Sequence, residues 1–494
     1  MDSELATTLY KSVAGDISVL IDSGTLLPGD RVPSVRRLSR QKRVSISTVL
    51  QAYRLLENRG VIEARPQSGY YVRRHTRTIA EPALTNPPKA PRPVGVHNLV
   101  SRVLAAGHDQ RVVKLGAAFP GHELMPAARL QRILSVTARR YPETLTTYSV
   151  PPGREELRRQ IARHALDWGC SFSSDDVIIT NGCMEALNLC LRAVAKPGNI
   201  VALESPTYFG VLQIIESLGL KALEIPTHPR DGISLDALTL ACEREKVAAC
   251  IVMSNVSNPL GSIMPESAKK KLVRLLAEHG VPLIEDLVYG DLYFRGSPPR
   301  AAKAYDKHGT VMLCSSFSKT LAPGFRMGWV APGRYYAQIE RLKFISSVGN
   351  PEVLQLTIAE FLENGGYDRH LRWLRRELAE RVESTKRAVC EHFPEGTRVT
   401  NPNGGFVVWV ELPPGTDSLA LYESAMREGI SIAPGPMFSA SDRYRNCVRL
   451  NCGCSWTPVV ERALARVGEI AKMQLARTTM HPRIRQHARP QFRD

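Results

Sequence analysis

Apolar residues in the first 75 positions recur every three or four residues, which is the period of short amphipathic helices. The pattern predicts a first helix that ends before Gly24, a second that starts at Ser34, and a third from about Ser45 to Gly60. The apolar face of the first helix comprises Leu9, Val13, Ile17, Leu20 and Ile21, and that of the third comprises Val49, Ala52, Tyr53 and Leu56. Two short β-rich runs around residues 66–69 predict a hairpin. Three helices and a hairpin indicate a winged helix-turn-helix.

A different pattern follows a proline-rich stretch. Residues 76–93 carry five prolines and little apolar periodicity, so we predict an extended linker over 76–112. From about residue 177 to 330, short apolar runs alternate with amphipathic stretches of helix length; the runs are DVIIT, NIVALE, AACIVM, VPLIED and TVMLCSS. This alternation predicts a mostly parallel α/β sheet. We therefore divide the chain into a head (1–75), a linker (76–112), a body (113–480) and a basic tail (481–494).

Composition and charge narrow the kind of partner. The 494 residues include 65 Lys and Arg against 48 Asp and Glu, and the formal net charge of +17 favours a polyanionic partner. The ten cysteines contain no C-x-x-C pair, so we expect a reducing cytoplasm and predict no metal site. We find no apolar run long enough to span a bilayer and no secretion signal, so neither a membrane nor export is expected.

The third predicted helix turns polar side chains away from the core, namely Ser47, Gln51, Arg54 and Asn58. In a winged helix-turn-helix this helix enters the major groove, where polar groups reach base edges and basic residues contact phosphates. Residues 1–75 contain twelve Lys and Arg and seven Asp and Glu, a net charge of +5 that suits double-stranded DNA. A small helical interaction domain with an ordinary solvated face is the alternative.

The stretch LLPGDRVPSVRRLSRQKRVSISTVLQAYRLLENRGVIEARPQSGYYV resembles the DNA-binding domain of GntR-family bacterial regulators. The resemblance rests on P-G-D-x-x-P-S-x-R, then V-S-x-x-T-V, an E-x-x-G turn and an S-G wing. The resemblance, together with the polar outward face of the third helix, indicates which residues contact DNA. They are Arg36, Ser45, Ser47, Thr48 and Gln51 on the helices, and Gln67, Ser68 and Gly69 at the wing tip. Ile46 stands where some members carry a base-reading arginine.

Polar groups follow the predicted strands of the body, one set at each carboxyl end. Ligands of parallel sheets bind at these ends. The candidates are Gly182 with the amides of Cys183 and Met184, then Tyr208, Asn258, Asp286 with Tyr289, and Ser316, Ser318 and Lys319. Each alone has an ordinary reading as a cap, a packed ring, a turn or a loop lysine. Five sets at five successive strand ends indicate one site.

The lysine of SSFSKTLAPGFRMGW indicates what this site binds. Lys319 lies among serines and apolar residues with only Arg326 nearby, and a lysine in surroundings that favour its neutral form is a nucleophile. Hydroxyls and an arginine suit a phosphate, so the combination indicates pyridoxal 5'-phosphate (PLP). The roles are Lys319 as the catalytic lysine, Asp286 on the ring nitrogen, Tyr208 against the ring, Asn258 and Tyr289 at the phenolic oxygen, and Ser316, Ser318, Arg326 and the amides of Cys183 and Met184 at the phosphate.

Residues from about 113 to 475 resemble fold-type I aminotransferases through YSVPPG, TNGCMEAL, ESPTYFG, NPLG, EDLVYGDL, SSFSKTLAPGFRMGW and VRLN. The resemblance implies a PLP-dependent transferase fold with a mostly parallel central sheet and a smaller C-terminal α/β part. It also implies that Arg449 binds the substrate α-carboxylate and that Tyr148 reaches the phosphate across a dimer interface. Cys183 and Met184 replace the small or hydroxyl residues of many relatives, so phosphate binding would depend more on backbone amides.

A GntR-like head, a long linker and an aminotransferase-like body are the arrangement of the MocR subfamily of regulators. This resemblance implies a PLP-binding transcriptional regulator that acts on double-stranded DNA as a domain-swapped homodimer, with PLP and in some members an amino acid or amine as effector. An active aminotransferase that carries a DNA-binding domain is the second hypothesis, because the same residues serve both. A scaffold without bound cofactor is the third.

Overall fold

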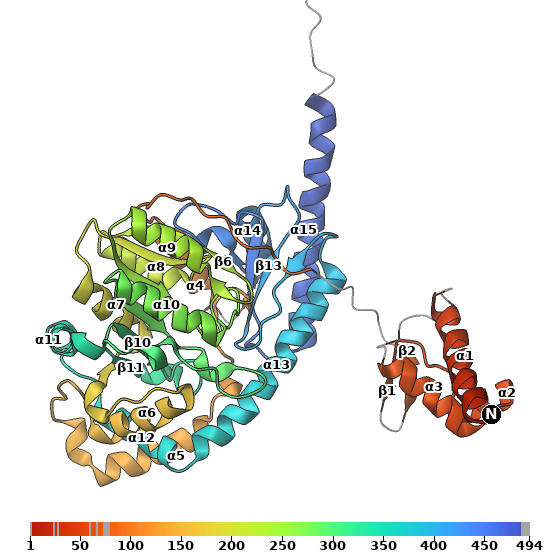
Figure 1. Ribbon diagram of the computed structural model, residues 1–494, viewed down its shortest axis with the longest axis horizontal. Helices are drawn as coiled ribbons and strands as arrows, with labels where there is room; N and C mark the ends of the chain where they lie inside the picture. The colour runs from red at the N-terminus through yellow and green to blue at the C-terminus, as the bar shows by residue number, and fades with distance from the viewer. Residues whose placement is uncertain are drawn as a thin grey trace, which may run out of the picture. The chain divides into compact units, whose positions relative to one another are not determined.

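The structure is a computed structural model that describes residues 2–22, 25–26, 29–58, 61–65, 68–72, 80–107, 109 and 111–485. The chain forms two compact units, a small unit (Met1–Thr78) and a large unit (Ile79–Asp494), coloured along the chain in Figure 1. The sequence pattern predicted this division between a head and a body.

The small unit contains three helices and a hairpin. The helices are α1 (Asp2–Asp22), α2 (Val35–Lys42) and α3 (Ile46–Asn58), and the hairpin pairs β1 (Ile62–Arg65) with β2 (Gly69–Val72) in antiparallel register. The Ser34 hydroxyl accepts a hydrogen bond from the Arg37 amide at 3.3 Å and so caps α2. The predicted winged helix-turn-helix is confirmed.

The core of the small unit follows the predicted apolar faces with two exceptions. Val49, Ala52, Tyr53 and Leu56 of α3 are all fully buried, as predicted. In α1, Val13 and Ile17 are buried, whereas Leu9 and Leu20 are 43% and 37% exposed. The face of α1 that packs on the core is centred on residues 10, 13, 14, 17 and 21, so Leu9 and Leu20 lie at its edges and the prediction was wrong for them.

The large unit is built on an eight-stranded sheet in the order β4-β11-β10-β9-β8-β5-β6-β7. The strands are β4 (Ile178–Thr180), β5 (Ile200–Ser205), β6 (Lys221–His228), β7 (Gly232–Ile233), β8 (Val247–Val252), β9 (Leu283–Asp286), β10 (Val311–Ser316) and β11 (Gly328–Ala331). Neighbours from β10 to β6 pair in parallel, and β11 and β7 pair antiparallel. The predicted mostly parallel sheet and all five of its predicted strands are present.

Helices cover both faces of this sheet (Figure 1). On one face, Ile178 of β4 packs in a buried cluster with Leu187 of α7 (Cys183–Val194). Residues of α8 (Phe209–Ser217) belong to the same cluster. The next residue of β4, Ile179, points the other way into a cluster with α6 (Glu155–Ala165) and α12 (Glu352–Glu363). Farther along that second face lie α9 (Leu235–Arg244) and α10 (Glu266–Glu278). Two-sided burial explains why the strands are continuous apolar runs.

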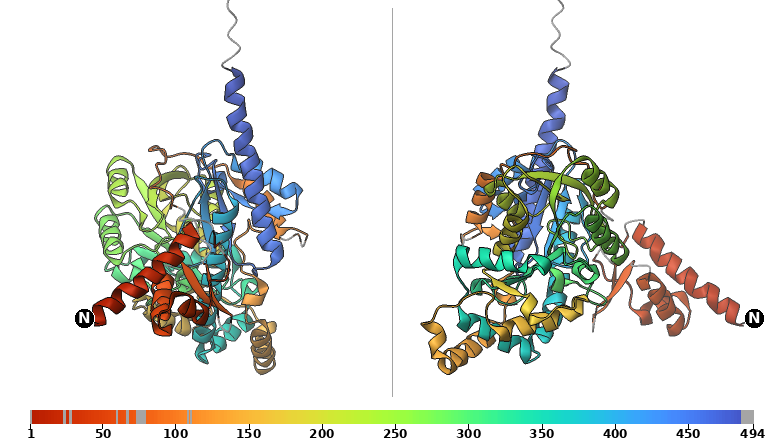
Figure 2. Two further views of the ribbon diagram at one scale, coloured as in Figure 1. Left: turned by 90° about the vertical axis from the view of Figure 1, so that its right-hand side faces the viewer. Right: turned by 60° about the vertical axis from the view of Figure 1, so that its left-hand side comes forward.

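A smaller C-terminal part contains a second sheet, as predicted. Its antiparallel strands are, in spatial order, β12 (Arg398–Val399), β13 (Val407–Glu411), β16 (Cys447–Asn451) and β15 (Ala433–Pro434). A separate parallel pair joins β3 (Val113–Lys114) to β14 (Ile430–Ser431). The remaining helices are α4 (His97–Ala106), α5 (Ala127–Arg140), α11 (Tyr336–Ser347), α13 (Gly366–His392), α14 (Ser418–Arg427) and α15 (Pro458–Arg485). The last turns of α15 project from the large unit (Figure 2).

Residues 80–107, which we expected to lie in the linker, are part of the large unit. Thr85 and Arg92 make backbone hydrogen bonds to Thr227 and Ala222 of β6, and α4 follows with Val100 and Val103 fully buried in the main core. Prolines favour extended backbone, and here that backbone lies along the edge of the folded unit instead of in solvent. Of the predicted tail, residues 481–485 continue α15, and 486–494 lie outside the described residues.

Candidate cofactor site and DNA-binding surface

The start of α3 presents an exposed polar surface on the small unit. Ser47 and Gln51 are exposed, Thr48 is half-buried, and Ile46 is exposed beside them; Arg36 of α2 is exposed as well. Ser45 has a structural role, because its hydroxyl accepts the Thr48 amide at 3.1 Å and so caps α3. The same hydroxyl lies 2.7 Å from the hydroxyls of Ser47 and Thr48.

The wing tip is partly described. Gly69 has a φ of +105°, and a Cβ there would lie 3.3 Å from the guanidinium of Arg31. Ser68 shares a 2.6 Å hydrogen bond with the hydroxyl of Tyr71, and Arg65 lies over the Tyr71 ring. Arg31, an exposed residue that the sequence pattern did not single out, therefore lies next to the wing residues. Gln67 lies outside the described residues.

Substitutions on α2 and α3 should separate phosphate contacts from base contacts. We expect Arg36→Ala to weaken binding to all DNA sequences and to lower the slope of log affinity against log salt by about one, as the loss of one phosphate contact does. Ser47→Ala should instead relax the preference at one or two base pairs. Fluorescence anisotropy at several salt concentrations measures both, with Arg159→Ala of the large unit as the control. Unchanged affinity and preference in both variants would contradict the assignment of this surface.

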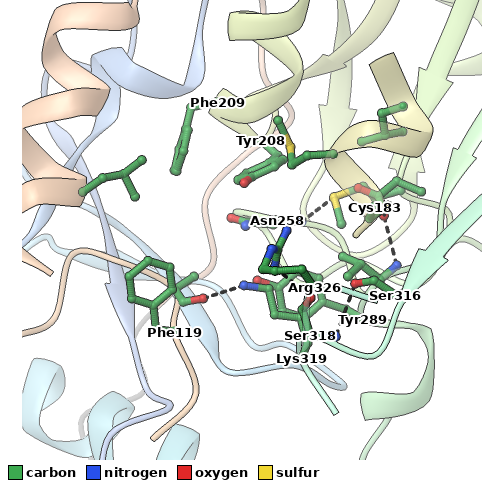
Figure 3. Close-up of a pocket in the computed structure, with 17 residues that line it drawn as sticks. Phe119, Cys183, Tyr208, Phe209, Asn258, Tyr289, Ser316, Ser318, Lys319 and Arg326 are labelled. Carbon is green, nitrogen blue, oxygen red and sulfur yellow. Dashed lines mark hydrogen bonds between the residues drawn. The ribbon is translucent and has the colours of Figure 1, made fainter. Parts of the chain in front are cut away.

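A cavity of about 300 Å³ opens at the carboxyl ends of the central strands (Figure 3). Ten of its lining residues were predicted from the sequence: Cys183, Met184, Tyr208, Asn258, Asp286, Tyr289, Ser316, Ser318, Lys319 and Arg326. Seven were not: Leu104, Ala118, Phe119, Leu187, Phe209, Met253 and Val288. The structure thus brings together ten of the twelve residues proposed for the cofactor and its substrate.

One corner of the cavity is suited to a phosphate. It lies at the N-terminus of α7, where the first amides of a helix are free to bind an anion. The preceding Gly182 has a φ of +81°, and a Cβ there would lie 2.5 Å from Nη2 of Arg326. Arg326 in turn donates to the Ser318 hydroxyl at 3.2 Å. Free amides, a glycine that leaves room and a guanidinium fit the phosphate of PLP.

Lys319 follows β10 at the floor of the cavity. Its ammonium donates to the carbonyl of Ala118 at 2.9 Å, and no ion pair joins it to a carboxylate of the described residues. Burial, followed by the charges of Arg449 and Arg326, lowers the pKa of Lys319 from its ordinary value of 10.5 to about 8. A lysine with this pKa is partly neutral near physiological pH and can act as a nucleophile.

If PLP attaches to Lys319, the pH dependence of its attachment should reflect this lowered pKa. The neutral amine is the form of Lys319 that attacks an aldehyde, and its fraction rises tenfold per pH unit below the pKa. The rate at which the visible absorption of lysine-bound PLP develops should therefore climb from pH 6.5 and level off above about pH 8. Stopped-flow mixing of cofactor-free protein with PLP measures this rate. A rate that still rises tenfold per unit at pH 9.5 would indicate a lysine with an ordinary pKa.

Asp286 ends β9 inside the cavity and is almost completely buried. Its carboxylate accepts hydrogen bonds from the Val288 amide at 3.0 Å and from the thiol of Cys183 at 3.4 Å. Burial raises the pKa of Asp286 to about 6. The Cys183 side chain therefore contacts the carboxylate, while its backbone amide belongs to the helix start, and this contact was not predicted from the sequence.

Arg449 on β16 lies directly behind the cavity and has no exposed surface. It donates from Nη1 to Oδ1 of Asn258 at 3.1 Å and from Nη2 to the carbonyl of Gly116. Its Nε is buried without a hydrogen-bond partner among the described residues. Burial lowers the pKa of Arg449 to about 10. Tyr148, by contrast, is 91% exposed and does not line the cavity.

The fold and the site define a class of protein with a winged helix-turn-helix and an aminotransferase-type domain. Residues 9–72 match the family of bacterial regulatory proteins, gntR family, and residues 111–467 match aminotransferase class I and II. The chain therefore belongs to the HTH-type transcriptional regulators of MocR architecture, in which a gntR-family DNA-binding domain precedes a class I and II aminotransferase domain.

Two regulators are similar to this chain over almost its whole length. The HTH-type transcriptional regulators YdcR and YjiR of Escherichia coli are 40% and 39% identical to this chain; each match covers 94% of the chain and 99% or 98% of the relative. The crystal structure of the Pyrococcus horikoshii kynurenine aminotransferase in complex with PMP superposes with a TM-score of 0.71 at 28% identity, over 77% of this chain and 94% of that one.

Neither a membrane-spanning helix nor a metal-binding cluster occurs among the described residues. Within the described residues, no helix has both the length and the apolar character that crossing a bilayer requires. Nor does the described part of the chain gather three or more His, Cys, Asp or Glu side chains as a metal site would.

Proposed function

We propose that this transcriptional regulator binds PLP in the cavity of its large unit and that the bound cofactor, with an amino acid or amine as a second ligand, changes how it binds DNA. One observation carries the proposal: Lys319, which forms no ion pair with a carboxylate of the described residues, shares one cavity with a phosphate corner and with Asp286. A buried cation, an anion site and a buried carboxylate match the amine, phosphate and ring nitrogen that PLP requires.

The residues of the cavity would divide the work as follows. PLP supplies an electron sink for bonds at the carbon that carries the ligand's amino group. The free amides of Cys183 and Met184 with Ser316, Ser318 and Arg326 would hold the phosphate, and Asp286 would hold the proton of the ring nitrogen. Tyr208 would pack on the ring, and Asn258 and Tyr289 would bind its phenolic oxygen. Lys319 would supply the amine that holds the cofactor. Arg449, whose Nε has no hydrogen-bond partner among the described residues, would bind a ligand carboxylate.

A second copy of the chain would complete the assembly. Exposed apolar side chains gather on two neighbouring segments and comprise Leu145, Tyr148, Val150, Phe344, Ile345 and Val348. The segments are in contact, because a Cβ on Gly349 would lie 2.2 Å from the carbonyl of Ser149. An exposed apolar patch of this kind marks an interaction surface. We propose a homodimer in which Tyr148 reaches the phosphate corner of the partner and in which the DNA-binding domains are swapped.

An active aminotransferase is the second candidate. The observation that favours it is the retention of Lys319, Asp286 and Arg449 around one cavity, because transamination requires the same groups as ligand sensing. The relatives of known activity include a kynurenine aminotransferase, which shares the fold of the large unit. Turnover, and not the site alone, distinguishes the two functions.

A visible absorption spectrum of the purified protein tests the proposal. PLP attached to Lys319 should give an absorption band that reduction with borohydride removes and that a panel of amino acids and amines shifts. DNA fragments selected from a random library by the protein should then be bound with an affinity that depends on PLP or ligand. Transamination faster than about 1 per second without any effect of ligand on DNA binding would favour the enzyme instead.

A further inference from the structure

The side of the cavity away from the phosphate corner is apolar. Among the described residues that line the cavity, only Asp286, Lys319 and Arg326 are charged, and the cofactor would engage all three. Phe119 and Phe209 lie on the opposite side from Cys183 and Ser316 (Figure 3). Leu104 of α4 and Ala118 line the cavity as well.

The two groups that would bind an amino acid each lie beside one of these rings. The ammonium of Lys319 is 5.8 Å from the centre of the Phe119 ring, and the guanidinium of Arg449 is 5.8 Å from the centre of the Phe209 ring. A ligand with its amino group near Lys319 and its carboxylate at Arg449 would therefore direct its side chain towards Phe119, Phe209 and Leu104. A charged side chain there would lose its hydration without gaining a partner, which is strongly unfavourable.

We infer that the second ligand is an α-amino acid with an apolar side chain. Acidic, basic and ω-amino ligands are disfavoured, because the described lining offers them no further charge. This inference rests on the proposed function, since it places the ligand against bound PLP.

Titration of the PLP-loaded protein tests the inference. L-leucine and L-phenylalanine should shift the absorption band with affinities at least about tenfold tighter than L-glutamate, L-lysine or 4-aminobutyrate. Equal or tighter binding of any of the three charged ligands would overturn it. A Leu104→Arg variant should gain affinity for L-glutamate, whereas Ser101→Arg, on the exposed face of the same helix, should not. Absence of the band itself would refute the proposed function and the inference with it.

A separate set of contacts concerns residues 80–92, here called the strap. By sequence the strap follows the DNA-binding domain, and within the large unit it touches both sheets. The Glu81 carboxylate accepts a hydrogen bond from Nε of Arg230, which lies just after β6 of the eight-stranded sheet. It also accepts a hydrogen bond at 3.2 Å from the amide of Asn401, which lies just after β12 of the four-stranded sheet. The carbonyl of Ala80 also accepts the Val399 amide of β12 at 3.1 Å. The Glu81 side chain is only 18% exposed, so its carboxylate lies mostly inside this junction.

The strap also contacts the end of β5, which leads to Tyr208 in the cavity. The Thr85 hydroxyl donates to the carbonyl of Ser205 at 2.6 Å and accepts the Thr227 amide at 2.8 Å. Ser205 ends β5, and Tyr208, three residues later, lines the cavity. The hydroxyl of Ser205 lies 2.7 Å from that of Tyr444 in the smaller C-terminal part. A shift of Tyr208, or of one sheet against the other, would therefore strain contacts made by the strap.

We propose that the strap transmits occupancy of the cavity to the DNA-binding domain and that Glu81 is its main anchor. Coupling of this kind requires an element whose contacts differ between the two states, and the strap contacts both sheets and the end of β5, which leads to Tyr208 in the cavity. This second inference also rests on the proposed function, although its first test measures hydrogen exchange of the strap itself.

Amide hydrogen exchange with and without PLP provides that test. Exchange at Thr85, Arg92 and Ala222 should change when PLP is added, and no change at these amides would overturn the inference. Glu81→Gln and Arg230→Gln should keep PLP absorption and ligand-free DNA affinity but lose a PLP effect on DNA binding that we expect to be at least about fivefold. Glu278→Gln, which removes a carboxylate from an exposed ion pair, is the control. Full coupling in both strap variants would contradict the role of Glu81, and a wild type without any PLP effect would refute the proposed function.

Discussion

We expect Lys319→Ala to abolish the visible absorption band and to weaken retention of PLP by at least about tenfold, while DNA binding without ligand stays within about twofold of wild type. The substitution removes the amine proposed to attach the cofactor but leaves the phosphate corner around Gly182 and Arg326 intact. The small unit, which carries the DNA-binding surface, is untouched. PLP or an amino ligand should therefore no longer change DNA affinity. Equilibrium dialysis and anisotropy measure the two affinities.

The control for this prediction is Lys271→Ala, which removes an exposed lysine from α10. It should retain the absorption band and the response of DNA binding to ligand. If Lys319→Ala kept a normal ligand response, sensing would not depend on the covalent attachment, and the cavity would act on PLP through its non-covalent contacts alone. If Lys319→Ala lost DNA binding altogether, the lysine would contribute to the fold instead of to sensing.

The fold was predictable where burial on two faces makes a strand a continuous apolar run. β5, β8 and β10 are such runs, and each was found within a few residues of its expected bounds. β6 was not predicted because Lys221, Glu224 and His228 interrupt its apolar run. A search for continuous apolar runs does not detect a strand of this kind.

The site was predictable to the extent that it lies at strand ends. Asp286 and Ser316 end β9 and β10, Lys319 lies in the segment after β10, and Asn258 lies in the segment after β8. Parallel pairing of these strands therefore brings the four residues together. Leu104 and Phe119 lie in helical and irregular segments before the first strand of the sheet, and no local signal connects them to a cavity more than 60 residues away in sequence. Arg449 was reached through the resemblance of VRLN and not through any pattern in the strand itself.

The predicted linker shows what composition does and does not determine. Five prolines predicted extended backbone over residues 76–93, and residues 80–92 do lack helices and paired strands. Their packing depends on backbone groups of Thr85 and Arg92 that hydrogen-bond to β6. Every residue except proline has an amide donor, so contacts made by the backbone cannot be predicted from the residue types. The extent of a linker therefore has to come from the structure.

We expect Arg449→Lys to weaken binding of carboxylate-bearing amino acids by at least about tenfold, or about 1.4 kcal/mol, with PLP absorption close to normal. Lysine keeps the charge but loses the planar fork of donors. In this site two nitrogens of the fork donate to Asn258 and Gly116, and Nε has no partner in the described part of the chain. A single ammonium can replace only part of this arrangement.

A pair of ligands separates carboxylate binding from a general disturbance of the cavity. L-leucine carries the carboxylate, and isopentylamine is the same molecule without it. Loss of affinity for L-leucine alone would assign Arg449 to the carboxylate, whereas equal losses for both ligands would show that the arginine acts by positioning Asn258. Arg445→Lys, which changes an exposed arginine paired with Asp417 and Asp442 just before β16, should bind both ligands as the wild type does. The comparison therefore distinguishes recognition of the ligand from support of the cofactor, because Asn258 lines the cavity and Arg449 lies behind it.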